Sequence, residues 1–271
     1  MKQELKQQLI DWAETYNDPV YFQEDPIAFP REFLSRGASL QDIEIAAIFA
    51  AHLAWGRRAM IVRDCNRLFD EMQWRPYNYI MAHDYRDDNT SLHRTVKWSE
   101  IAQICNHLFH FYKAARPLPL ETVSRSLDPT AIAVPPLMVP RVAQVPGAEV
   151  CSANSRSLES LSVDEIRTTI FRQKEDKRAA NKKINMMRRW MVRDDGKVDL
   201  GLWKHTSAAD LIIPLDVHVY TQAAALGLTG RKQKDIVTAQ QITDAFKEIW
   251  PDDPVKGDFA LFGYGVTRKD A

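Results

Sequence analysis

Hydrophobic residues recur along most of the chain at the spacing of an amphipathic α-helix, and the alternation typical of strands is scarce. Residues 2–16 show this spacing, with one apolar face formed by Leu5, Leu9, Trp12 and Ala13. Similar patterns predict helices over about 40–55 (with Ser39 as its N-cap), 61–69, 98–115, 238–250 and 258–266. We therefore expect an all-α fold.

The middle of the chain does not follow this pattern. Residues 117–146 hold 7 of the 14 prolines, and residues 152–162 add five serines. Proline removes a backbone donor and serine competes for backbone hydrogen bonds, so a long helix is excluded here. We interpret residues 117–165 as an irregular connection between an N-terminal helical lobe (1–116) and a second helical lobe (166–271).

Composition excludes several classes of protein. The three cysteines are widely spaced and form no CxxC pair, so neither a cysteine zinc site nor a four-cysteine iron–sulfur cluster is expected. The longest apolar run, Ile45 to Ala51, is far shorter than the roughly 20 residues of a membrane span, and the N-terminus has no signal sequence. We expect a cytoplasmic protein that does not contact a membrane.

Charge is unevenly distributed along the chain. The 36 basic and 36 acidic residues cancel, yet residues 172–193 contain nine Lys or Arg against two acids, a net charge of +7. Such a segment is suited to holding a polyanion, although a solvated helix face explains it equally well.

The segment 211–228 (LIIPLDVHVYTQAAALGL) contains one acidic residue in an apolar setting. Pro214 restricts the backbone just before Asp216, and helical spacing begins after it. This pattern predicts that Asp216 lies at a helix N-terminus, where backbone N–H groups favour the ionised carboxylate. A simple capping role is the alternative.

The segment 181–203 (NKKINMMRRWMVRDDGKVDLGLW) begins a predicted helix with Lys182 and Lys183 in its first turn. Neighbouring cations lower one another's pKa, and burial lowers it further, giving the neutral amine that covalent catalysis requires. Two solvated surface lysines are the alternative.

Both segments, together with DPVKGDFALFGYG (253–265), resemble the bacterial domain of unknown function 2400 family. The PLDVHV block is also similar to the aspartate block of the helix-hairpin-helix DNA glycosylases, which include endonuclease three. The resemblance implies a two-lobed all-α fold and removal of damaged bases with abasic-site lyase activity. It also implies that Asp216 is the essential carboxylate, and that Lys182, with Asn185 three residues on, is the nucleophile, with Lys183 as second choice.

The same resemblance implies a DNA partner and no cofactor. We expect Arg178, Arg188 and Arg189 to contact phosphates, and an aromatic ring to stack on an extruded base, with four candidates: Trp190, Trp55, Trp203 and Tyr220. Two features depart from the glycosylases. The glycine-rich hairpin is not recognisable in EDKRAAN (175–181), and the C-terminal cysteine cluster is absent.

Two other functions are consistent with the residues. One is a nucleic-acid-binding module without catalysis, which the missing glycine hairpin favours. The other is a metal or small-molecule enzyme that uses His107 and His110, three apart on a predicted helix, or the pair Asp216 and His218.

Overall fold

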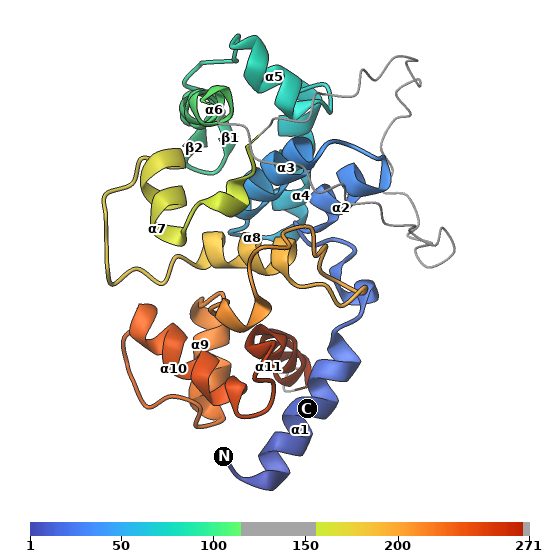
Figure 1. Cartoon of the computed structure of the whole chain (residues 1–271), viewed down its shortest axis with the longest axis vertical. Helices are drawn as coiled ribbons and strands as arrows, with labels where there is room; N and C mark the ends of the chain where they lie inside the picture. Colours follow the sequence, from blue (N-terminus) through green and yellow to red (C-terminus); the bar gives the residue numbers. More distant parts are fainter. Residues whose placement is uncertain (115–155, 268–271) are drawn as a thin grey trace.

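The computed structural model describes residues 1–114 and 156–267, and the part of the chain it describes is all-α apart from one small hairpin (Figure 1). The hairpin pairs β1 (Ser91–His93) with β2 (Val96–Lys97) in antiparallel fashion. The described helices are α1 (Gln3–Tyr16), α2 (Ala28–Ser35), α3 (Leu40–Leu53), α4 (Arg58–Glu71), α5 (Pro76–Ala82), α6 (Trp98–Lys113), α7 (Val163–Glu165), α8 (Lys182–Val192), α9 (Val217–Ala225), α10 (Ile236–Lys247) and α11 (Gly257–Thr267).

The buried apolar side chains form two clusters. The larger cluster surrounds α3, which is buried on nearly every side because its sequence between Ile43 and Leu53 is almost continuously apolar. Helices α2, α4, α6 and α8 contribute to the same cluster. The smaller cluster joins α1 to α9, α10 and α11, with Leu9, Ile242 and Phe246 fully buried.

Each cluster contains segments that are distant from one another in the chain. Helix α1 packs against α11, so the N-terminal helix lies beside the C-terminal one (Figure 1). Helix α8 packs against α3 in the larger cluster. The chain therefore crosses between the clusters after α1, and again after α8.

The expected connection at 117–165 falls mainly on residues 115–155, which lie outside the described residues. Its last part contains a single turn of 3₁₀-helix (Leu158–Ser160) and the short α7, which begins with a capping box between Ser162 and Glu165. Among the described residues, no helix has the length and apolar character that crossing a membrane requires.

A buried carboxylate ties this last part to the larger cluster. Glu44 of α3 has no exposed surface and accepts hydrogen bonds from Tyr112 Oη (3.1 Å), Leu158 N (3.0 Å), Trp203 Nε1 (2.8 Å) and Ser157 Oγ. Burial raises the pKa of Glu44 to about 7, although the hydrogen bonds from these four donors lower this pKa. One carboxylate thus joins α3, α6 and two later loops.

Candidate functional site

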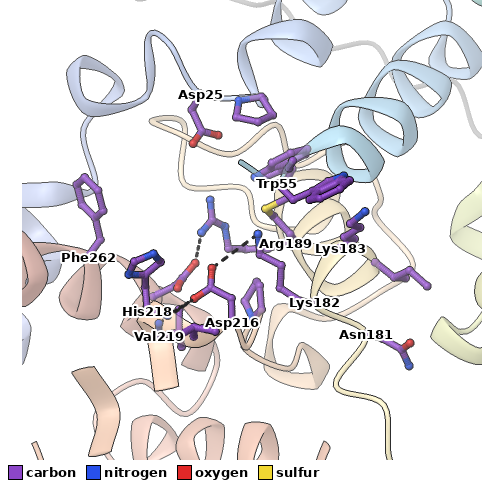
Figure 2. A pocket seen from close by; sticks show the side chains of 18 of the residues that line it. Asp25, Trp55, Asn181, Lys182, Lys183, Arg189, Asp216, His218, Val219 and Phe262 are labelled. Atoms are coloured by element: carbon purple, nitrogen blue, oxygen red, sulfur yellow. Dashed lines mark hydrogen bonds and ion pairs between the residues drawn. The ribbon is translucent and has the colours of Figure 1, made fainter. Parts of the chain in front are cut away.

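The carboxylate of Asp216 is fixed at the start of α9. Its Oδ1 accepts hydrogen bonds from the backbone N–H of His218 (2.8 Å) and of Val219 (2.9 Å), which is the N-cap arrangement predicted from the sequence. These two bonds use one oxygen and leave Oδ2 directed away from the helix (Figure 2). The capping role and an exposed second oxygen therefore coexist in the same side chain.

Lys182, the first residue of α8, reaches this second oxygen. Its Nζ lies 3.8 Å from Asp216 Oδ2, although the two residues are 34 positions apart in the chain. The side chains are 28% and 34% exposed respectively, so a ligand in the cavity can contact both. The structure thus brings together an amine and a carboxylate from two different helices.

Lys183 lies next to this pair in a more enclosed environment. Its Nζ donates a hydrogen bond to the backbone carbonyl of His52 and lies 5.8 Å from the ring centroid of Trp55. Burial, and secondarily the charge of Lys182, lowers the pKa of Lys183 to about 8. A substantial part of this amine is therefore neutral near physiological pH.

These side chains line a cavity of about 1090 Å³. Its walls come from both hydrophobic clusters, and the volume is at the upper end of the range for small-molecule sites. Polar lining residues include Asp25, His52, Arg58, Lys182, Asp216 and Asp258. Trp55 and Phe262 are among its aromatic residues (Figure 2).

A buried ion-pair network supports α8 beneath the cavity. Arg193 donates to Asp253 (2.8 Å) and to Asp199 (2.6 Å), and Arg189 pairs with Asp199 (3.3 Å) and Asp258. Burial disfavours the charge of Arg189, but the two aspartates outweigh it and raise the pKa of that guanidinium. The network joins α8 to the loop that follows it and to α11.

The four expected DNA-contact residues have different positions. Arg178 is exposed in the loop before α8, and half-buried Arg188 donates to the carbonyl of Leu161. In contrast, Arg189 is 5% exposed and Trp190 is fully buried. Both residues line the cavity described above, but Arg189 pairs with Asp199 and Asp258, and Trp190 packs in the larger cluster. In this structure little or none of their side-chain surface is exposed to a nucleic acid.

The other aromatic candidates divide in the same way. Trp203 is buried, with its Nε1 on Glu44, and Tyr220 donates to the carbonyl of Arg231 (2.9 Å). Trp55 is half-buried and lines the cavity. Trp190 also lines the cavity but is fully buried, so Trp55 is the candidate ring with exposed surface at the site.

Of the residues considered for a metal site, His107 and His110 do not line this cavity, whereas Asp216 and His218 do. His107 Nδ1 is hydrogen-bonded to the carbonyl of Ile170 (2.8 Å), and His110 is exposed on α6. Within residues 1–114 and 156–267, no group of three or more His, Cys, Asp or Glu side chains is arranged to hold a metal ion. Cys65 and Cys105 are buried free thiols, and burial raises the pKa of both.

The sequence pattern did not single out Asp25, Arg58 or His52, which line the same cavity. Asp25 follows a short 3₁₀ turn and Arg58 begins α4, and neither lies in a motif. Their convergence depends on packing between segments that are distant in the chain, so no local signal reveals it.

One family model, described as "Protein of unknown function (DUF2400)", matches residues 25–267. The matched region contains α2 to α11, and with them Asp25, Lys182, Lys183 and Asp216. No curated protein and no solved structure shows a significant match to the chain.

Proposed function

The chain belongs to the DUF2400 family of proteins of unknown function, and we propose that it is a DNA N-glycosylase with abasic-site lyase activity. The observation that carries the proposal is the approach of Lys182 Nζ to Asp216 Oδ2, 3.8 Å apart at the wall of one cavity. An amine and a carboxylate in this arrangement are the two groups that base excision through a Schiff base requires.

Each group has a role in this chemistry. Loss of a base from C1′ of the sugar develops positive charge on the sugar, which the Asp216 carboxylate stabilises electrostatically. Lys182 loses its ammonium proton to solvent, and the electron pair of its amine bonds to C1′. The bond from C1′ to the ring oxygen then breaks, the ring oxygen takes a proton, and the C1′–N bond becomes a Schiff base that permits cleavage of the DNA strand.

The fold is consistent with this proposal. The resemblance to the helix-hairpin-helix glycosylases implies two helical lobes with the site between them, and the cavity here is lined from two hydrophobic clusters. Asn181, directly before α8, has φ +47°, a backbone conformation that glycine adopts most readily. At this turn before α8, an asparagine therefore occupies a position where glycine is favoured.

Exposed basic residues near the cavity suit a phosphate backbone. The loop before α8 presents Arg172, Lys174, Lys177 and Arg178, all exposed. Exposed Arg57 and Arg58 lie at the start of α4, and Arg58 lines the cavity. These basic residues support the proposal that the protein contacts the phosphates that flank an extruded nucleotide.

Borohydride trapping on a duplex with one abasic site tests the proposal. We expect wild-type protein to form a covalent adduct and Lys182→Gln to form none. Lys113→Gln is the matched control, because Lys113 is exposed at the end of α6 and does not line the cavity. Absence of a wild-type adduct, under conditions that trap a known lyase, would overturn the lyase activity.

Asp216→Asn tests the carboxylate separately. Asparagine can still accept the two N-cap hydrogen bonds but carries no charge, so DNA affinity is retained. Base release should slow by about 100-fold, the range seen when a stabilising electrostatic group is removed from an active site.

A further inference from the structure

A second carboxylate faces the cavity from the wall opposite Asp216. Asp25 lies between the 3₁₀ turn Pro19–Phe22 and α2, and its side chain is 21% exposed. Figure 2 shows its carboxylate directed into the cavity, toward the side where Arg189 and Asp216 lie. The two acids therefore approach a bound ligand from different directions.

One oxygen of Asp25 is available to a ligand. Oδ1 accepts the backbone N–H of Ile27 at 3.2 Å, which fixes the carboxylate. Oδ2 lies 3.9 Å from a guanidinium nitrogen of Arg58, beyond hydrogen-bond distance, and no hydrogen bond to it is found among the described residues. A ligand is thus the natural partner of this second oxygen.

Burial raises the pKa of the Asp25 carboxyl group above its ordinary value. The hydrogen bond from Ile27 N and the charges of Arg58, Arg189 and Lys182 lower this pKa without cancelling the effect of burial. The charge of Arg31 also acts on Asp25. Asp216 has a different position, because two backbone N–H groups hold its side chain at the N-terminus of α9. The two acids are therefore suited to different roles.

We infer that Asp25 is the catalytic acid that protonates the departing base, an inference that rests on the proposed function. A nucleophile and a leaving group occupy opposite sides of the carbon at which displacement occurs. Since Lys182 approaches C1′ from the wall that carries Asp216, the base departs toward the wall that carries Asp25. A base leaving as an anion is a poor leaving group, and a proton delivered to it assists cleavage.

In the proposed step, Lys182 displaces the base from C1′ while Asp25 protonates it. Lys182 first releases its ammonium proton to solvent. The electron pair of the resulting amine forms the new bond to C1′, and the electron pair of the broken C1′–N bond goes to the base. The proton of Asp25 passes to the base, which leaves neutral, and Asp25 becomes a carboxylate. The lysine nitrogen, now cationic, loses a proton to Asp216. Before the next turnover, solvent restores the proton of Asp25 and removes the proton from Asp216.

The experiment separates base release from strand cleavage. Wild type, Asp25→Asn and Glu24→Gln are assayed on duplexes that carry one uracil, hypoxanthine or 8-oxoguanine, and on a duplex with a preformed abasic site. Asparagine keeps an oxygen for Ile27 N but has no acidic proton to donate. Glu24 is exposed and does not line the cavity, so Glu24→Gln is the matched control.

We expect Asp25→Asn to slow base release by about 100-fold and to leave the abasic-site reaction within about twofold of wild type, because no base departs there. Wild-type base release should fall as pH rises above the pKa of Asp25, and the variant should lack this decline.

Four other outcomes overturn the inference. If Asp25→Asn releases bases at the wild-type rate, Asp25 is not the acid. If Asp25→Asn slows base release and the abasic-site reaction equally, Asp25 has only a structural role. A wild type that traps abasic DNA but releases none of the three bases also overturns it, while the lyase activity stands. A wild type inactive on every substrate overturns the proposed function itself, and this inference with it.

Discussion

Lys183 should titrate far below an ordinary lysine. With a pKa of about 8, about a quarter of its amine is neutral at pH 7.5, whereas a lysine with a pKa of 10.5 is neutral to only about one part in a thousand. The neutral fraction is therefore raised by roughly 200-fold. Burial is the larger cause and the charge of Lys182 the smaller, so Lys182→Gln should raise this pKa only part of the way to 10.5.

Isotope-edited NMR of ¹³C-methylated lysines, followed from pH 6 to 11, measures this directly. Lys183→Gln assigns the resonance, and exposed Lys113 serves as the internal reference. The reasoning is refuted if Lys183 and Lys113 titrate together near pH 10.5. It is also refuted if Lys182→Gln alone restores an ordinary pKa, since burial would then contribute nothing.

Three further predictions concern stability, each measured by urea unfolding. The pKa of Glu44 is about 7 in the folded state and near 4.5 in the unfolded state, so the folded state binds more protons between these pH values. The free energy of unfolding should therefore fall by up to about 3 kcal/mol as pH rises from 4.5 to 7. Glu44→Gln should flatten this decline, and an unchanged slope would count against it. Asp216→Ala should cost about 1 kcal/mol through loss of the N-cap, and Asp216→Asn only a few tenths; equal losses would contradict the capping geometry. Gly257→Ala should cost about 2 kcal/mol, because its Cβ would lie 2.3 Å from the buried Phe246 ring, whereas Gly230→Ala, with nothing within 4 Å, should be neutral.

Helix positions could be predicted from the sequence wherever an apolar stripe was long. The stripe predicted over residues 2–16 forms α1, and Ser39 caps α3 through the N–H of Asp42 as expected. Helices α2 and α5, of 8 and 7 residues, were not predicted, because two turns are too short for a 3.6-residue period to stand out. Sequence periodicity also could not show that α1 packs against α11.

The basic segment at 172–193 shows why charge alone is an incomplete guide. Its net charge of +7 suited it to holding a polyanion, and a solvated helix face explained this charge equally well. The folded chain divides it, with Arg178 exposed in a loop while Arg189 and Arg193 are buried against aspartates. One of these partners, Asp258, is 69 residues from Arg189, so the sequence near α8 contains no sign of the pairing.

The candidate site was predicted in part. Asp216 and Lys182 emerged from local patterns, an apolar lead-in with Pro214 and a lysine pair at a helix start, together with the resemblance to a known family. Asp25 did not, because an aspartate in a loop is ordinary in sequence and gains its character only from burial in the cavity. A residue whose role depends on packing between distant segments can be identified only from the three-dimensional structure.

The most direct test of the account is to identify the residue that bonds to DNA. Wild-type protein is trapped with borohydride on an abasic duplex, digested with a protease and a nuclease, and the modified peptide is sequenced by mass spectrometry. The account predicts a single adduct on the side chain of Lys182, next to Asp216. An adduct on a lysine outside the cavity, or on the N-terminal amine, would contradict it.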